Sequence, residues 1–119
     1  MPNKSKCGVF NIADLVGKKW TIVVLQEIEH NGDKGFNKII GRMKKISPKL
    51  LAQRLRELEE DGIIEKKVIT DRMPVRTVYK LTKKGKDLEE VIETMRKFNF
   101  NYSNQKSLCK HECVACSLY

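Results

Sequence analysis

Three cysteines with metal-ligand spacing lie within the last eleven residues of this 119-residue chain. Cys109, Cys113 and Cys116 follow the pattern Cys-x3-Cys-x2-Cys, and His111 lies between the first two. Thiolates this close together commonly hold Zn²⁺ in a tetrahedral site or an iron–sulfur cluster. A closed site requires a fourth ligand, which either Cys7 or His111 could supply. We therefore predict a zinc site or an iron–sulfur cluster here, with a cysteine-rich tail that binds no metal as the alternative.

Residues that would mark an enzyme are scarce. The two histidines are His30 and His111, and the chain has no glycine-rich phosphate loop, no Gly-x-Ser-x-Gly sequence and no His-Glu-x-x-His pair. Cys113 and Cys116 form a Cys-x-x-Cys pair, so a small thiol-redox protein is an alternative interpretation. Thioredoxin-like chemistry places such a pair in a strand–helix–strand unit, which the end of this chain lacks. We predict that the protein is not an enzyme.

The charge balance indicates an anionic partner. Lysine and arginine number 24 against 15 aspartate and glutamate residues, which gives a formal net charge of +9. Nucleic acid is the leading candidate, because phosphate contacts dominate the affinity of basic domains for DNA and RNA. The alternatives are an architectural protein that binds DNA with little sequence preference, and a solvated surface that needs no partner.

Neither a membrane span nor a secretory signal is evident. The longest purely aliphatic stretch, residues 22–25, is far shorter than the ~18 residues that a spanning helix needs. Residues 1–7 contain no long apolar segment. The four cysteines do not resemble the disulfide frameworks of oxidising compartments. We expect a cytoplasmic protein with no membrane partner.

The clearest local signal predicts a capped helix over residues 47–61. Ser47 before Pro48 is a strong helix start, because serine caps the first backbone amides and proline suits the first turn. Asp61-Gly62 is typical of a helix end. The leucines at 51, 55 and 58 share one face, and Arg54 lies on the flank. The opposite face carries hydrogen-bond donors suited to DNA: Lys49, Gln53 and Arg56.

A basic β-hairpin is predicted to follow this helix. Residues 63–69 and 75–81 have the composition of strands, and residues 70–74 between them have that of a turn. Cations at the tip and along the flanks could neutralise DNA phosphates. They are Lys66, Lys67, Arg72 and Arg76.

Three helical segments and one long final helix complete the prediction. Apolar patterning indicates helices over 11–15, 20–28 and 36–43, and Thr82 begins the last helix. That helix has apolar residues at 88, 91, 92, 95, 98 and 102, which we expect to pack against a second subunit. The order of helix, turn, capped helix and basic hairpin is that of a winged helix-turn-helix. We predict an α+β, mostly α, domain over 7–104 with a C-terminal dimerisation helix, followed by a cysteine-rich tail over 105–119.

Several segments resemble the HxlR-type branch of the MarR-like transcription regulators. They are Gly-Lys-Lys-Trp at 17–20, the run from Ser-Pro-Lys to Asp-Gly-Ile-Ile at 47–64, and Tyr-Lys-Leu-Thr-Lys-Lys-Gly at 79–85. The resemblance covers residues 7–98. It implies a homodimer joined through its terminal helices that binds a palindromic operator in double-stranded DNA. It further implies that the groove is contacted by Ser47, Lys49, Gln53, Arg54 and Arg56, and that Arg72 and Arg76 belong to the wing.

The same resemblance implies a sensing role for Cys7. Members of the branch often carry a cysteine shortly before the first helix that senses oxidants or electrophiles, and Cys7 occupies that position, although Gly8 follows where proline is common. A reactive thiolate needs nearby cations or a helix N-terminus. A metal ligand and an inert thiol are the alternatives. The sequence thus predicts a dimeric, sequence-specific DNA-binding transcription regulator that responds to redox state or metal through its cysteines.

Overall fold

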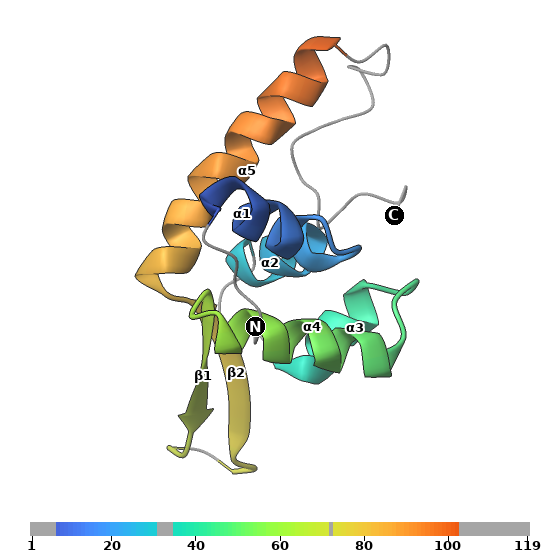
Figure 1. Cartoon of the computed structure of the whole chain (residues 1–119). Helices are drawn as coiled ribbons and strands as arrows, with labels where there is room; N and C mark the ends of the chain where they lie inside the picture. The colour runs from blue at the N-terminus through green and yellow to red at the C-terminus, as the bar shows by residue number, and fades with distance from the viewer. Residues whose placement is uncertain (1–6, 31–34, 72, 103–119) are drawn as a thin grey trace.

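A computed structural model describes residues 7–30, 35–71 and 73–102 of the chain. Their elements, shown in Figure 1, are α1 (Gly8–Val16), α2 (Thr21–His30), α3 (Phe36–Arg42), α4 (Pro48–Glu60), β1 (Ile64–Ile69), β2 (Arg76–Leu81) and α5 (Lys83–Tyr102). This order confirms the predicted α+β, mostly α, fold with a hairpin between two helices. None of the helices in these ranges is both long and apolar enough to cross a membrane.

Helix α4 has the cap and the faces that the sequence predicts. The backbone N–H of Leu50 donates to the Oγ atom of Ser47 at 3.1 Å, and Pro48 occupies the first turn. Leu51, Leu55 and Leu58 are buried. The chain leaves the helix through Gly62, whose φ of +76° is in the left-handed region that glycine adopts without a steric penalty.

Strands β1 and β2 form an antiparallel hairpin that is anchored at its base. The register runs from Ile64 opposite Leu81 to Ile69 opposite Arg76. Each strand begins one residue later than predicted, at 64 and 76 in place of 63 and 75. Ile64 and Leu81 are buried, whereas the rest of β1 is exposed or partly exposed. The far end of the hairpin therefore projects from the body of the molecule (Figure 1).

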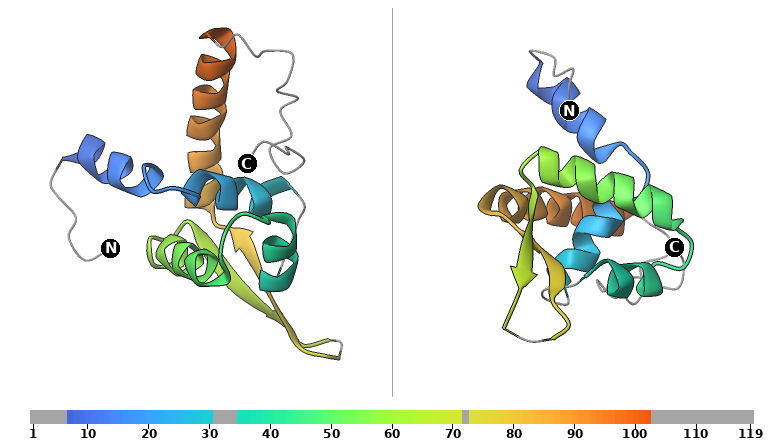
Figure 2. Two further views of the ribbon diagram at one scale, coloured as in Figure 1. Left: turned by 90° about the vertical axis from the view of Figure 1, so that its right-hand side faces the viewer. Right: turned by 90° about the horizontal axis from the view of Figure 1, so that it is seen from below.

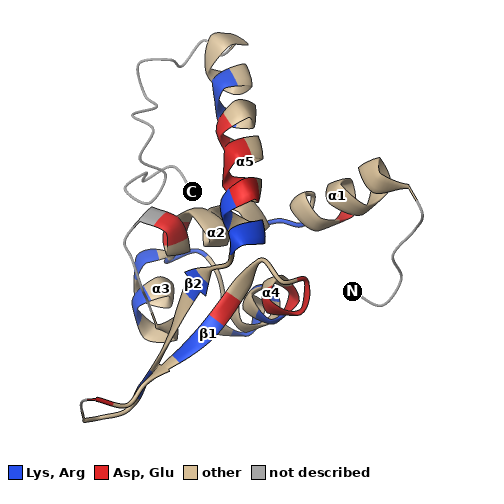
Figure 3. Ribbon diagram, turned by 90° about the vertical axis from the view of Figure 1, so that its left-hand side faces the viewer, with Lys and Arg blue, Asp and Glu red and all other residues tan. Residues whose placement is uncertain are grey.

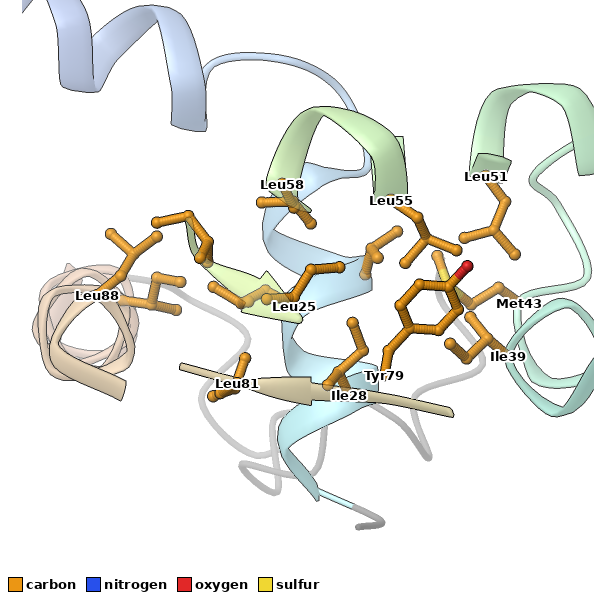
Figure 4. Packing of buried hydrophobic residues seen from close by; sticks show 14 of the residues in the cluster. Leu25, Ile28, Ile39, Met43, Leu51, Leu55, Leu58, Tyr79, Leu81 and Leu88 are labelled. Carbon is orange, nitrogen blue, oxygen red and sulfur yellow. The ribbon is translucent and has the colours of Figure 1, made fainter. Parts of the chain in front are cut away.

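The hydrophobic core joins α2, α3 and α4 to the base of the hairpin. Leu25 and Ile28 of α2 lie at its centre, and Figure 4 shows leucines of α4 pointing toward them from one side. Tyr79 and Leu81 of β2 close the opposite side. Because one cluster holds these elements together, α4 and the β1–β2 hairpin, which we call the wing, keep a fixed position relative to each other.

Helix α1 begins at Gly8, earlier than the predicted start at residue 11. The difference arises because Cys7 caps the helix: the Phe10 N–H donates to its Sγ atom at 3.4 Å, and the Asn11 N–H donates to its carbonyl oxygen at 3.1 Å. Cysteine is not among the preferred capping residues, so the sequence carries no strong start signal here. Val9 and Phe10 of the added turn are exposed.

Helix α5 packs closely against the domain at its start and is exposed at its far end. A Cβ atom at Gly85 would lie 2.2 Å from the carbonyl oxygen of Ile63, so only glycine allows this close approach. The predicted apolar stripe divides between two environments. Leu88 and Ile92 are buried in the domain core, which corrects the expectation that the whole stripe lacks a partner within the domain. The remaining members are at least partly exposed: Val91, Met95, Phe98 and Tyr102.

Candidate nucleic-acid interface

The exposed face of α4 carries three long polar side chains opposite its buried leucines. Lys49, Gln53 and Arg56 are all exposed, as the sequence predicts. Their spacing of four and three residues places them along one stripe of a helix with 3.6 residues per turn. A helix is about 10–12 Å across with its side chains, so this face fits the DNA major groove. The stripe combines a bidentate amide with two cations.

The segment that precedes α4 adds two basic residues that were not predicted as DNA contacts. Lys44 and Lys45 are exposed and lie shortly before the cap. Ser47 is also exposed, and a hydroxyl that accepts from the Leu50 N–H can still donate its own proton. The signal in the sequence was the basic run at 42–45 next to the Ser-Pro helix start. Together these residues extend the donor-rich stripe beyond the first turn of α4.

Arg54 has a different environment from its neighbours on α4. Its Nε atom donates to the carbonyl oxygen of Lys19 at 3.0 Å, and its Nη1 atom lies 2.7 Å from Oε1 of Glu57. Only 13% of the side chain is exposed. The Nζ atom of Lys18 lies 2.9 Å from Oε2 of the same glutamate. The guanidinium predicted to face the groove is therefore held against the segment between α1 and α2.

Glu57 is the acceptor shared by both cations. Partial burial acts to raise the pKa of Glu57, but hydrogen bonds from Lys18 and Arg54 outweigh it, so that the pKa lies below its ordinary value. Glu57 is thus ionised at neutral pH and satisfies the two cations together.

The wing presents cations on both of its faces. Lys66 lies opposite Tyr79, on the face next to α4, and its Nζ atom is 3.8 Å from Oε1 of Glu59. Residues that are adjacent in a strand point to opposite faces, so Lys67 and Arg76 lie on the other side, and both are exposed. Figure 3 shows lysine and arginine on α3 and along the hairpin, and it shows acidic residues in the middle of α5 and at the end of α4. Arg72 lies outside the described residues.

Cys7 lies at the tip of α1, away from the basic surface. The side chain is exposed, and α1 projects from the body in Figure 2. Leu15 is the one buried residue of this helix. A cavity of about 370 Å³ separates α1 from α5, with Ile12, Leu88 and Val91 among its lining residues. The helix that carries the thiol is thus held to the body mainly at its C-terminal end.

The predicted metal ligands Cys109, His111, Cys113 and Cys116 lie outside the described residues. Within residues 7–30, 35–71 and 73–102, no group of three or more histidine, cysteine, aspartate or glutamate side chains could hold a metal ion. Cys7 itself belongs to the described part. Its predicted role as a fourth ligand requires the tail cysteines, however, and therefore stays a prediction.

The capped helix in the core, the preceding helix and the basic hairpin define a winged helix-turn-helix. Residues 15–107 match the HxlR-like helix-turn-helix family, and the chain therefore belongs to this family. The HTH-type transcriptional regulator YodB of Bacillus subtilis is 38% identical over 82 residues, which are 69% of this chain and 71% of YodB. The uncharacterised HTH-type regulator sll1512 of Synechocystis is 33% identical over 101 residues, 85% of this chain and 73% of its own length. The protein is a transcriptional regulator of the helix-turn-helix type.

Solved structures confirm the fold. The reduced form of YodB from B. subtilis has a TM-score of 0.73 at 33% identity, covering 84% of this chain and 97% of that chain. The redox regulator HypR in its reduced form has a TM-score of 0.70 at 29% identity, covering 80% of this chain and 92% of that chain. YodB has also been solved in diamide-treated and quinone-bound forms, and HypR in an oxidised form.

Proposed function

We propose that this protein is a homodimeric, sequence-specific DNA-binding regulator whose affinity for its operator changes when Cys7 is oxidised or alkylated. The observation that carries the DNA-binding part is the exposed stripe of Lys49, Gln53 and Arg56 on α4, opposite three leucines in the core. A helix with one face in the core and a donor-rich face in solvent is suited to the major groove.

Each part of the basic surface has a separate role in this proposal. Gln53 and Arg56 read base edges, because a glutamine amide pairs with adenine and a guanidinium pairs with guanine in the major groove. Lys49 and Ser47 contact phosphates beside the helix and fix its register. Lys66, Arg72 and Arg76 of the wing neutralise phosphates of the neighbouring DNA backbone. Lys44 and Lys45 extend these phosphate contacts before α4.

The proposed dimer uses the exposed apolar faces of α1 and α5. Phe98 and Tyr102 are 68% and 80% exposed, and their ring centroids lie 5.3 Å apart. Val9 and Phe10 of α1 are 76% and 59% exposed. Large apolar side chains grouped on the two terminal helices favour burial against a second copy of the chain. Two α4 helices would then enter successive major grooves about 34–36 Å apart on a palindromic site.

Cys7 is the proposed sensor because it is exposed at the start of α1 and its sulfur accepts the Phe10 N–H. The names of the solved relatives support this role, since they describe YodB with diamide or quinone and HypR in two redox states. With diamide, two thiols lose two protons and two electrons and form one disulfide, while diamide is reduced to the hydrazine. With a quinone, the thiolate sulfur bonds to a ring carbon, and the ring takes up a proton to give the substituted hydroquinone.

DNA selection followed by affinity measurement tests this proposal. The full-length reduced protein is used to recover duplexes from random-sequence DNA, and its affinity for the recovered duplex is compared with that for a scrambled duplex of the same composition. We expect at least ~10³-fold preference for the recovered duplex and strong salt dependence. Equal affinity for both duplexes would instead support an architectural DNA-binding protein. Thiol–disulfide turnover without DNA affinity would support a small redox protein.

The sensing part of the proposal is tested on the same duplex after diamide treatment. A change in affinity that disappears in the Cys7→Ser variant is expected. An unchanged affinity, or a change that persists in Cys7→Ser, would contradict the role of Cys7 as the sensor.

A further inference from the structure

The segment between α1 and α2 is fastened to the middle of α4 by a group that spans 39 residues of sequence. Lys18 Nζ lies 2.9 Å from Glu57 Oε2, and Glu57 Oε1 lies 2.7 Å from Arg54 Nη1. Arg54 Nε completes the group by donating to the carbonyl oxygen of Lys19 at 3.0 Å. The exposed fraction of the side chain is 29% for Lys18, 21% for Glu57 and 13% for Arg54, so the two ion pairs are partly shielded from water. We call Lys18, Arg54 and Glu57 the linker clamp.

The backbone beside the linker clamp is strained. Trp20 has a φ of +80°, which is in the left-handed region that bulky residues rarely adopt. Its ring packs partly against the core, and the Nζ atom of Lys19 lies 5.5 Å from the ring centroid. Such a conformation persists only where the surroundings enforce it. The core contact of the Trp20 ring and the Arg54–Lys19 hydrogen bond hold this strained residue and the residue before it.

Helix α1 is otherwise weakly attached to the domain. Leu15 is its one buried residue, the cavity of about 370 Å³ lies between it and α5, and its first turn is exposed. Nine residues at 1.5 Å per residue make a lever about 13 Å long, with Cys7 at the outer end and Gly17 at the inner end. A movement of α1 is therefore passed to the body at its inner end, through the buried Leu15 and through Lys18 and Lys19, which follow the helix directly.

We propose that the linker clamp is the connection through which the state of Cys7 reaches the DNA-contacting helix, so that Lys18, Glu57 and Arg54 are positioning residues. This inference rests on the proposed function. Arg54 and Glu57 each lie next to a member of the exposed stripe, Gln53 and Arg56, on the same turns of α4. With the clamp closed, α4 has the placement seen here. When a modified Cys7 displaces α1, Lys18 and the Lys19 carbonyl withdraw from α4 and the clamp opens. The two arrangements must differ in affinity for DNA, since only a differential affinity can couple the sites.

Two variants of opposite charge separate the clamp from general electrostatics. Glu57→Gln raises the net charge by one and Lys18→Met lowers it by one, and each removes the same ion pair. Glu59→Gln is the matched control, because it makes the same charge change on α4 while Glu59 contacts Lys66 of the wing. All variants are made in the full chain with Cys109, Cys113 and Cys116 replaced by serine, so that N-ethylmaleimide reacts at Cys7 alone.

The readouts are the ratio of DNA affinities before and after alkylation and the emission of Trp20, the one tryptophan of the chain. The DNA probe is a duplex recovered by selection from random-sequence DNA. In the parent chain and in Glu59→Gln we expect an affinity ratio of at least about fivefold and a shift of Trp20 emission on alkylation. In both Glu57→Gln and Lys18→Met the ratio falls below about twofold and the emission shift is lost.

Three outcomes would overturn the inference. If the two clamp variants move DNA affinity in opposite directions and keep the parent ratio, their effect is electrostatic and the clamp transmits nothing. If the parent chain binds the duplex but does not respond to alkylation, the sensing part of the proposed function fails together with the clamp. If Glu59→Gln loses the ratio as the clamp variants do, any charge change on α4 suffices, and the specific contact to the linker is not required.

Discussion

Arg54 of α4 donates from its Nε atom to the carbonyl oxygen of Lys19 at 3.0 Å, although 35 residues separate the two in sequence. This bond, together with the contact of Nη1 with Glu57, engages two of the three guanidinium nitrogens. A side chain held in this way supports the placement of α4 more directly than it could read a base. The relationship gives a testable distinction between Arg54 and its neighbour Gln53.

Arg54→Ala is expected to destabilise the fold by about 1 kcal/mol, because it removes an exposed hydrogen bond to Lys19 and a partly buried one to Glu57. It should also weaken binding to every duplex by a similar factor. Urea unfolding and affinities for the selected duplex and its single-base variants check both expectations. A loss confined to one base pair of the site would show instead that Arg54 reads that base, in keeping with the groove contact that the family resemblance implies.

Acid unfolding should change in opposite directions in two glutamate variants. The pKa of Glu57 is lowered from 4.5, since the hydrogen bonds from Lys18 and Arg54 outweigh the effect of burial. Its stabilising contribution is therefore present above pH 4.5 and is lost as the pH falls through the lowered pKa. Glu57→Gln should be less stable than the parent at neutral pH, and the difference should narrow in acid.

The pKa of Glu89 in α5 is shifted in the opposite direction from that of Glu57. Burial and the nearby charge of Glu29 raise its pKa, and the hydrogen bond from Gln26 and the charge of Arg96 only partly offset them. The ionised form therefore opposes folding at neutral pH, and this effect is relieved as the pH falls through the raised pKa. Glu89→Gln should be more stable than the parent at neutral pH, with the gain lost below pH 4.5. Urea unfolding at several pH values is the measurement, and shifts of the same sign in both variants would contradict the assignment.

Gly85→Ala should be among the most damaging conservative substitutions in the described residues. The added Cβ atom would lie 2.2 Å from the backbone oxygen of Ile63, which cannot move without disturbing the Thr82–Ile63 contacts at the start of α5. We expect a loss of about 3 kcal/mol or more. Gly41→Ala in α3 is the matched control, because nothing lies within 4 Å of its added Cβ and alanine favours helices by about 1 kcal/mol. Thermal unfolding of the two variants should differ in sign, and equal stability would refute the steric argument.

The cysteine-rich tail is expected to bind zinc or an iron–sulfur cluster through Cys109, Cys113 and Cys116. Metal analysis and an optical spectrum of protein purified without oxygen are the measurements, with Cys113→Ser expected to lose the metal. Comparison of Cys7→Ser with His111→Ala identifies the fourth ligand, because removal of the true ligand weakens metal retention. Full-length reduced protein without stoichiometric zinc or iron would contradict the metal prediction and leave the tail as a set of thiols.

The sequence predicts α4 and the wing well because their signals are local. The Ser47 cap, the leucines on one face and the turn-forming residues before Pro74 each act within a few positions of the chain, so a pattern can reveal them. The exposed positions of Lys49, Gln53 and Arg56 follow directly from the burial of the leucines.

Two features that the sequence did not reveal depend on contacts between distant segments. The hydrogen bond of Arg54 involves the Lys19 carbonyl, and the requirement for glycine at 85 arises from the Ile63 carbonyl. No periodicity or composition contains these two relationships, because each is created when two remote parts of the backbone meet. The early start of α1 is a local feature, but it depends on a cysteine cap that statistics do not favour.

In the proposed function the exposed face of α4 reads DNA sequence, and Gln53→Ala tests this role most directly. Affinities of the full-length reduced protein and of this variant are measured for the selected duplex and for duplexes with each base pair of a half-site replaced in turn. We expect Gln53→Ala to lose about 1–3 kcal/mol of binding free energy on the selected duplex and to become indifferent to substitution at one base pair. An equal loss on every duplex, or no loss on any, would contradict it.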